Sequence, residues 1–136
     1  MNPLDIIAKY YPVGSEAYRI LVIHSRSVAD KALAIARMHP EMNLDLTFVE
    51  EAAMLHDIGI FRCNAPDIDC HGDAEYICHG YLGAELMRAE GYPRHARVCE
   101  RHTGTGITLA MIEERGLPLP PVSYTHLRAH ETLMNL

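Results

Sequence analysis

Residues 52–61 read AAMLHDIGIF, an apolar run interrupted by one histidine and one aspartate, His56 and Asp57. Apolar residues also recur three and seven positions before His56, which is the spacing of one helix face. We therefore predict a buried helix that passes through His56 and is ended by Gly59. The two polar side chains at its end need partners, because an unpaired buried polar group costs about 1–3 kcal/mol.

Helical spacing extends over the rest of the chain. No segment alternates apolar and polar residues as a half-buried strand does, so the sequence predicts an all-α fold. The helix through His56 opens at Asp45 or Thr47, and Ser15 caps the long helix before it. The other predicted helices cover residues 3–11, 16–38, 78–90, 94–101 and 107–115. Residues 61–77 form a polar loop that is long enough to be a functional feature.

Length and charge restrict the class of protein. The 136 residues correspond to one domain, and 12 basic against 18 acidic side chains give a net charge of −6. This charge disfavours nucleic acid and anionic membranes as partners. The sequence has no long apolar run and no signal-peptide pattern, and its four cysteines form no CxxC pair. We therefore expect a cytoplasmic protein with reduced thiols.

Histidine is unusually frequent, with nine residues in the chain. Four of them, His24, His56, His79 and His102, fall on the apolar stripes of predicted helices, so we expect them to point inward. Few core carboxylates are available to pair with them, and Asp57 stands beside His56. Four inward imidazoles and a carboxylate are best explained as ligands of a shared ion. Such donors suit Mn, Fe, Ni or Zn.

The remaining histidines have simpler interpretations. His39 lies at a helix end, where an imidazolium complements the helix dipole. His71 lies in the loop, and we expect His95 in the first turn of an exposed helix. An alternative metal site, a small zinc centre, would use the donors that gather in the loop: Cys63, Cys70, His71 and Cys78.

The ordered set His24, the HDIG quartet at 56–59, His79 and His102 resembles the HD-domain superfamily of metal-dependent phosphohydrolases, in its HDIG-containing branch. The surrounding blocks IHSRSVADKALAIA, AAMLHDIGIF, CHGYLGAELMR and ERHTGTGIT are similar to a small stand-alone prokaryotic subfamily. The resemblance implies a helical bundle that holds metal between its helices. His24 and the quartet's His and Asp would hold one ion, the Asp would bridge, and His79 and His102 would hold a second.

The resemblance implies hydrolysis of a nucleotide or another small phosphorylated metabolite with one or two divalent transition-metal ions. Asp57 would be the catalytic residue, and Lys31 and Arg101 are the candidate cations for substrate phosphate. Many HDIG members place Lys or Arg where this chain has Ile60. Two alternatives are a di-iron oxygenase of the same superfamily, whose activity would stop without O₂, and a non-catalytic nucleotide-binding regulatory domain.

The last stretch, residues 122–136, reads VSYTHLRAHETLMNL and resembles translated sequencing-adapter sequence. We therefore expect the HD-like domain to comprise residues 1–121, without its C-terminal helix. The superfamily places a further Asp ligand on a late helix, whereas the last Asp of this chain is Asp73. We accordingly expect this chain to bind metal weakly or partially.

Overall fold

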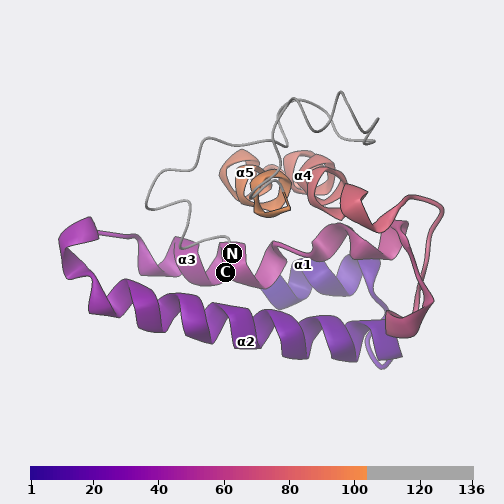
Figure 1. Cartoon of the computed structure of the whole chain (residues 1–136), viewed down its shortest axis with the longest axis horizontal. Coiled ribbons are helices and arrows are strands. Elements are labelled where there is room, and N and C mark those ends of the chain that lie inside the picture. Colours follow the sequence, from indigo (N-terminus) through magenta and orange to yellow (C-terminus); the bar gives the residue numbers. More distant parts are fainter. Residues whose placement is uncertain (104–136) are drawn as a thin grey trace.

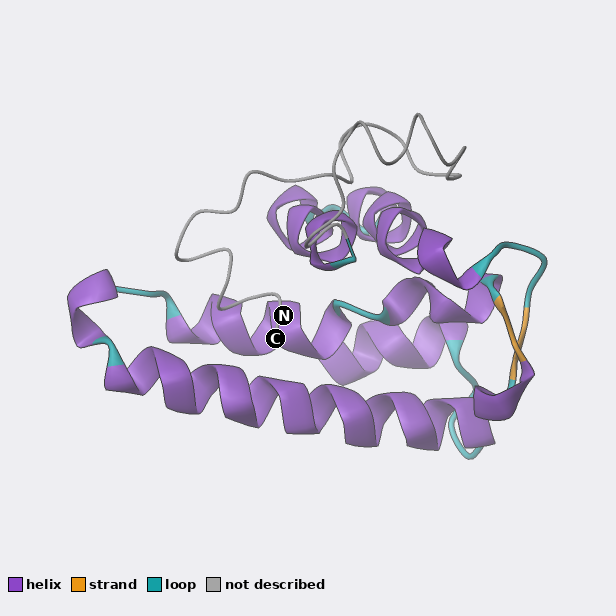
Figure 2. Ribbon diagram, viewed as in Figure 1, coloured by secondary structure: helices purple, strands orange, loops and turns teal. Residues whose placement is uncertain are grey.

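The computed structural model describes residues 1–103, and this part of the chain is mostly helical, which agrees with the predicted helical bundle (Figures 1 and 2). Its α-helices are α1 (Pro3–Tyr10), α2 (Glu16–Met38), α3 (Leu46–Leu55), α4 (His79–Ala89) and α5 (Pro93–His102). They agree with the predicted helices to within a few residues, except at the end of α3. The predicted helix at residues 107–115 and the segment 122–136 lie outside the described residues.

Side-chain caps explain where α2 and α3 begin. The Ser15 hydroxyl accepts a hydrogen bond from the amide of Tyr18 at 3.1 Å, which confirms the predicted cap of α2. The Asp45 carboxylate accepts one from the amide of Phe48 at 3.1 Å, so α3 opens after Asp45 rather than at Thr47. In this part of the chain, no helix combines the length and the apolarity that crossing a bilayer requires.

The HDIG segment does not continue α3, contrary to the prediction. The helix ends at Leu55, and a 3₁₀ helix, η2 (Ile58–Arg62), follows after one turn. Gly59 lies inside η2 without a positive φ, so it does not end a helix in the left-handed conformation. A Cβ at Gly59 would instead overlap the backbone oxygen of His79 and the backbone nitrogen of Gly83. Glycine is required here because the backbones of η2 and α4 touch.

The predicted loop at 61–77 is built from short ordered elements. Two-residue strands β1 (Asn64–Ala65) and β2 (Cys70–His71) pair antiparallel, and they are the orange segments at one end of the molecule in Figure 2. Two 3₁₀ helices, η3 (Pro66–Ile68) and η4 (Tyr76–Cys78), lie between and after them. A further 3₁₀ helix, η1 (Pro40–Met42), connects α2 to α3. The loop therefore leads back to the start of α4 in a defined conformation.

The helices form two layers. α2 packs along α3, whereas α4 packs against α5 and η2. In Figure 1, α4 and α5 are seen end-on and cross over the layer of α1, α2 and α3. The core between the layers contains Ile7, Leu55, Ile58 and Met87, all fully buried. The HDIG segment thus lies where the two layers meet.

Tyr11, the residue that follows α1, connects this helix to η2 by hydrogen bonds. Its side chain is 2% exposed, and its hydroxyl donates to the carbonyl of Ile58 at 2.8 Å and accepts from the amide of Phe61 at 3.0 Å. Both backbone groups belong to η2. One phenol therefore bonds two backbone groups of η2.

We expect Tyr11→Phe to lower the free energy of unfolding by about 2–3 kcal/mol, because it removes a hydrogen bond to the buried carbonyl of Ile58 and one from the part-buried amide of Phe61. Tyr10→Phe is the matched control, since the Tyr10 hydroxyl donates to Glu90 at 2.8 Å near the surface. We expect the control to lose less than about 1 kcal/mol. Urea denaturation of both variants measures the difference, and equal losses would contradict the role given to Tyr11.

Candidate metal centre

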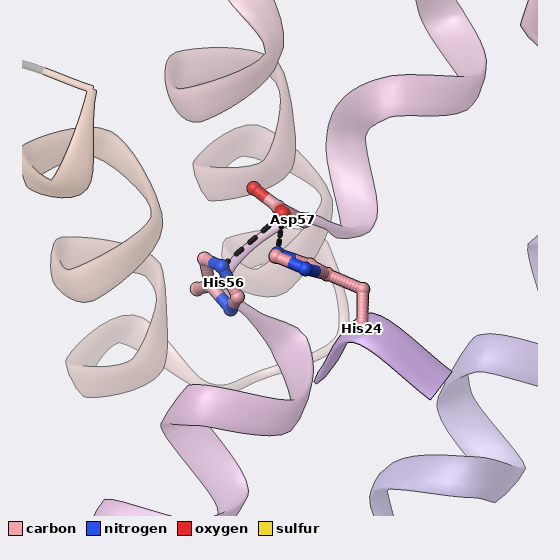
Figure 3. A group of neighbouring side chains, drawn as sticks. All are labelled: His24, His56 and Asp57. Atoms are coloured by element: carbon pink, nitrogen blue, oxygen red, sulfur yellow. Dashed lines mark ion pairs between the residues drawn. The ribbon is translucent and has the colours of Figure 1, made fainter. Parts of the chain in front are cut away.

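All five predicted ligands come together, although they lie on separate elements. They are His24 in the middle of α2, His56 and Asp57 between α3 and η2, His79 at the start of α4, and His102 at the end of α5. Figure 3 shows the imidazoles of His24 and His56 directed at the Asp57 carboxylate. The meeting of the two helical layers therefore creates the cluster.

Asp57 is the centre of this arrangement. Its Oδ2 lies 3.1 Å from Nε2 of His24 and 3.2 Å from Nε2 of His56. Its Oδ1 lies 3.1 Å from Nε2 of His79 and 3.0 Å from Nε2 of His102. The carboxylate thus joins two groups of three ligands, and the donor atoms within each group lie within 4.8 Å of one another.

The second ring nitrogen of three histidines is bound to the backbone. In His56, His79 and His102, Nδ1 lies 2.5–2.7 Å from the carbonyl oxygen three residues earlier. A carbonyl can only accept, so Nδ1 carries a proton, and in the neutral ring Nε2 presents a lone pair to the cluster. Histidine ligands of metals are commonly oriented by such a bond from the other nitrogen.

The arrangement of these lone pairs fits a bound cation. Nε2 of His79 lies 3.0 Å from Nε2 of His102, and Oδ1 of Asp57 lies close to both. In the neutral form of both rings the proton is on Nδ1, so neither Nε2 has a proton to bridge these acceptors. A divalent ion would satisfy all of them at once, so the cluster can bind metal.

The protonation of the cluster also suits a metal. Burial raises the pKa of Asp57, but the surrounding imidazoles, with His102 contributing most, lower it by more, and the pKa lies well below its usual range. Burial lowers the pKa of His102 despite the opposing effect of Asp57. The cluster therefore offers an ionised carboxylate and a neutral imidazole, the forms that coordinate metal ions.

His24 differs from the other ligands, and the prediction that it points into the core is wrong. Its side chain is 54% exposed, whereas those of His56 and His79 are 8% and 6% exposed. The hydrogen bond with Asp57 raises the pKa of His24, and partial burial opposes this effect. His24 therefore marks the solvent-accessible side of the cluster.

A cavity of about 280 Å³ opens onto the cluster and is lined by the five ligands together with Tyr76 and Thr103. The Tyr76 ring lies 4.4 Å from that of His79, and the Thr103 hydroxyl is buried without a partner among the described residues. Sequence reasoning missed both residues. Their closeness in sequence to predicted ligands could have indicated them, because Tyr76 is three residues before His79 and Thr103 follows His102.

The two predicted substrate cations lie near the cluster but outside this cavity. Lys31 is exposed on α2, seven residues after His24, which is about 10 Å along the helix axis. Arg101 is half-buried on α5, next to His102. Neither is among the described residues that line the cavity. Their role in binding phosphate stays a prediction.

Two other expectations about histidine and cysteine are wrong or unsupported. His95, expected on an exposed helix, is 8% exposed; its Nε2 lies 2.9 Å from Oε1 of Glu51, and its ring packs against Phe48 and Tyr92. The alternative zinc site does not form, because within residues 1–103 neither group of convergent donors includes a cysteine. The four cysteines are buried free thiols.

An all-helical bundle with a His/Asp cluster that can bind metal defines the class of this protein. Residues 21–130 match the HD domain family, and the chain belongs to this family. The match confirms the resemblance seen in the HDIG quartet and its histidines.

Three relatives of the chain are archaeal proteins. The chain is 34% identical over 116 residues to a tRNA (cytidine(56)-2'-O)-methyltransferase of Thermoplasma volcanium, an alignment that covers 85% of this chain and 29% of the relative. It is 34% identical over 117 residues to an uncharacterized protein of Methanocaldococcus jannaschii, covering 84% and 62%. It is 32% identical over 101 residues to the corresponding methyltransferase of Picrophilus torridus, covering 74% and 26%. The chain thus spans less than two thirds of each relative, and no solved structure matches it significantly.

Proposed function

We propose that this chain is a metal-dependent phosphohydrolase that acts on a nucleotide or another small phosphorylated metabolite. The observation that supports this most directly is the carboxylate of Asp57, shared by two groups of histidines at the wall of a cavity. Two ligand groups with one common carboxylate leave room for one or two ions, and adjacent divalent ions suit phosphate chemistry.

Each residue of the centre has a distinct part in the proposal. His56, His79 and His102 are pre-oriented by their backbone bonds, and Asp57 supplies the negative charge that holds the ions. A bound Mn, Fe, Ni or Zn ion would offset phosphate charge and lower the pKa of water toward neutrality. His24, on the exposed side, lies where substrate would enter. Lys31 and Arg101 are the candidates for additional phosphate contacts.

The tRNA methylation named for two relatives is not part of the proposal. This chain spans 29% and 26% of those proteins, so their activity belongs to much longer chains. The net charge of −6 also disfavours a polyanionic nucleic acid as substrate. A small phosphorylated molecule fits the 280 Å³ cavity better.

The test is phosphate release by the chain loaded with Mn²⁺ or Fe²⁺, measured over a panel of nucleotides and phosphomonoesters. We expect turnover that EDTA abolishes, that persists without O₂, and that falls at least about 100-fold in His79→Gln, because a ligand is lost. His39→Gln is the control, since His39 is exposed and pairs with Glu41 at 2.9 Å. A folded, metal-loaded chain that releases no phosphate from any compound would overturn the proposal.

A further inference from the structure

A second cavity adjoins the metal centre and is unlike the first. It has a volume of about 230 Å³ and shares His24, Asp57 and Tyr76 with the cavity at the cluster. Most of its remaining wall is apolar, formed by Ala17, Ile20, Leu21, Ile60, Ile68 and Cys70. Because the two cavities have these three residues in common, the apolar space lies directly beside the cluster.

The Tyr11 hydroxyl and the Cys70 thiol, two polar groups of this wall, are already bonded within the protein. The Tyr11 hydroxyl, which also lines the cavity, donates to Ile58 and accepts from Phe61. The Cys70 thiol donates to the carbonyl of Ile68 at 3.7 Å. A hydroxyl placed against Ile20 and Leu21 would lose its water without gaining a partner, whereas an apolar group would gain from leaving water.

The size of the cavity limits what can occupy it. An apolar protein cavity of about 150 Å³ is known to accept benzene. A space of 230 Å³ therefore admits one ring or a short branched chain, but it is smaller than the usual site for a drug-sized ligand. In a nucleoside 5'-phosphate or a sugar phosphate, the hydroxyl-bearing sugar follows the phosphate directly and would occupy this apolar space.

We propose that this cavity binds the apolar organic group of a phosphomonoester whose phosphate lies at the metal centre. The inference rests on the proposed hydrolase function and narrows its substrates to phosphate esters of small apolar alcohols or phenols. Nucleotides and sugar phosphates are then poor substrates. The cavity acts as the specificity-determining part of the site, and the His/Asp cluster acts on the phosphate common to all candidates.

Two isoleucines on α2 provide a matched pair of variants. Ile20 is half-buried and lines the cavity, whereas Ile23, on the same helix, is 59% exposed and is not among the lining residues. Ile20→Asn makes the wall polar without adding charge near the phosphate. Ile23→Asn makes the same chemical change outside the cavity. Ile20→Phe is a second test variant, which stays apolar and reduces the space.

Binding is measured first, with phosphonates that cannot be hydrolysed. We expect the Mn²⁺-loaded chain to bind phenylphosphonate at least about tenfold more tightly than 2-hydroxyethylphosphonate in titration calorimetry. Ile20→Asn should reduce this ratio about tenfold, Ile20→Phe should weaken phenylphosphonate selectively, and Ile23→Asn should change neither affinity. Equal affinities for the two phosphonates in the unmodified chain would overturn the inference.

Hydrolysis is measured second, with n-butyl phosphate and glycerol 3-phosphate, whose leaving groups are both alkoxides. We expect kcat/KM to favour n-butyl phosphate at least about tenfold and Ile20→Asn to remove the preference. If both esters are hydrolysed equally and Ile20→Asn has no effect, the apolar site is wrong while the hydrolase function stands. If phenylphosphonate binds preferentially but neither ester nor any nucleotide is cleaved, the binding site stands and the hydrolase function is wrong.

Discussion

Replacing Asp57 with asparagine is expected to lower the affinity of the chain for divalent transition metals at least about 100-fold and to abolish metal-dependent phosphate release. The Asp57 carboxylate lies 3.0–3.2 Å from Nε2 of all four clustered histidines and belongs to both ligand groups. Asparagine keeps the shape of the side chain but removes the charge. Both groups therefore lose their carboxylate ligand at once.

Metal content after gel filtration and titration calorimetry with Mn²⁺ measure this effect. Asp30→Asn is the matched control, because Asp30 is exposed on α2 and pairs only at the surface, with Arg26 at 3.0 Å. We expect the control to retain the metal affinity of the unmodified chain. If Asp57→Asn retained metal with an affinity within tenfold of the unmodified chain, Asp57 would not be the shared ligand.

Gly59→Ala is expected to lower the free energy of unfolding by about 3 kcal/mol or more. The added Cβ would overlap backbone atoms of His79 and Gly83, which cannot rotate away as the end of a side chain can. Relief of the clash requires η2 and α4 to separate. Since η2 follows Asp57 and α4 begins at His79, the same substitution should also weaken metal binding.

Gly14→Ala separates this effect from the general cost of replacing glycine. Gly14 has φ +93°, and a Cβ added there would meet nothing within 4 Å, so alanine suffers only backbone strain, about 1 kcal/mol. Urea denaturation gives the two losses, and Mn²⁺ titration of the folded variants gives the effect on the site. A Gly59→Ala chain as stable as Gly14→Ala would show that the backbones of η2 and α4 can separate at little cost.

The features that were predicted correctly are those that residues close together in the sequence determine. The bounds of α2 follow from its apolar period and from the Ser15 cap, and the observed cap confirms the latter. The candidate ligands could also be predicted from the sequence, because four histidines fall on apolar stripes and one aspartate follows the third helix. Periodicity indicated correctly that His56, His79 and His102 face inward, but it does not show what they meet.

Predictions failed where distant segments decide the outcome. His95 is buried where its ring packs against Phe48, 47 positions earlier, and its Nε2 lies 2.9 Å from Oε1 of Glu51. His24 is more exposed than its stripe indicates because it lies at the open edge of the cluster. Tyr76 differs from these two cases, because it lies only three residues before the His79 ring that it contacts, and this local signal was missed.

The sequence alone determined the helical class, most helix starts and the candidate donors of a metal centre, because period, capping and residue type act over a few neighbouring positions. Only the tertiary structure decided that Asp57 joins two ligand groups, that Gly59 allows two backbones to touch, and that an apolar cavity adjoins the cluster. These features depend on the distances between atoms of different elements. Such distances are set by how the helical layers pack, which no local pattern contains.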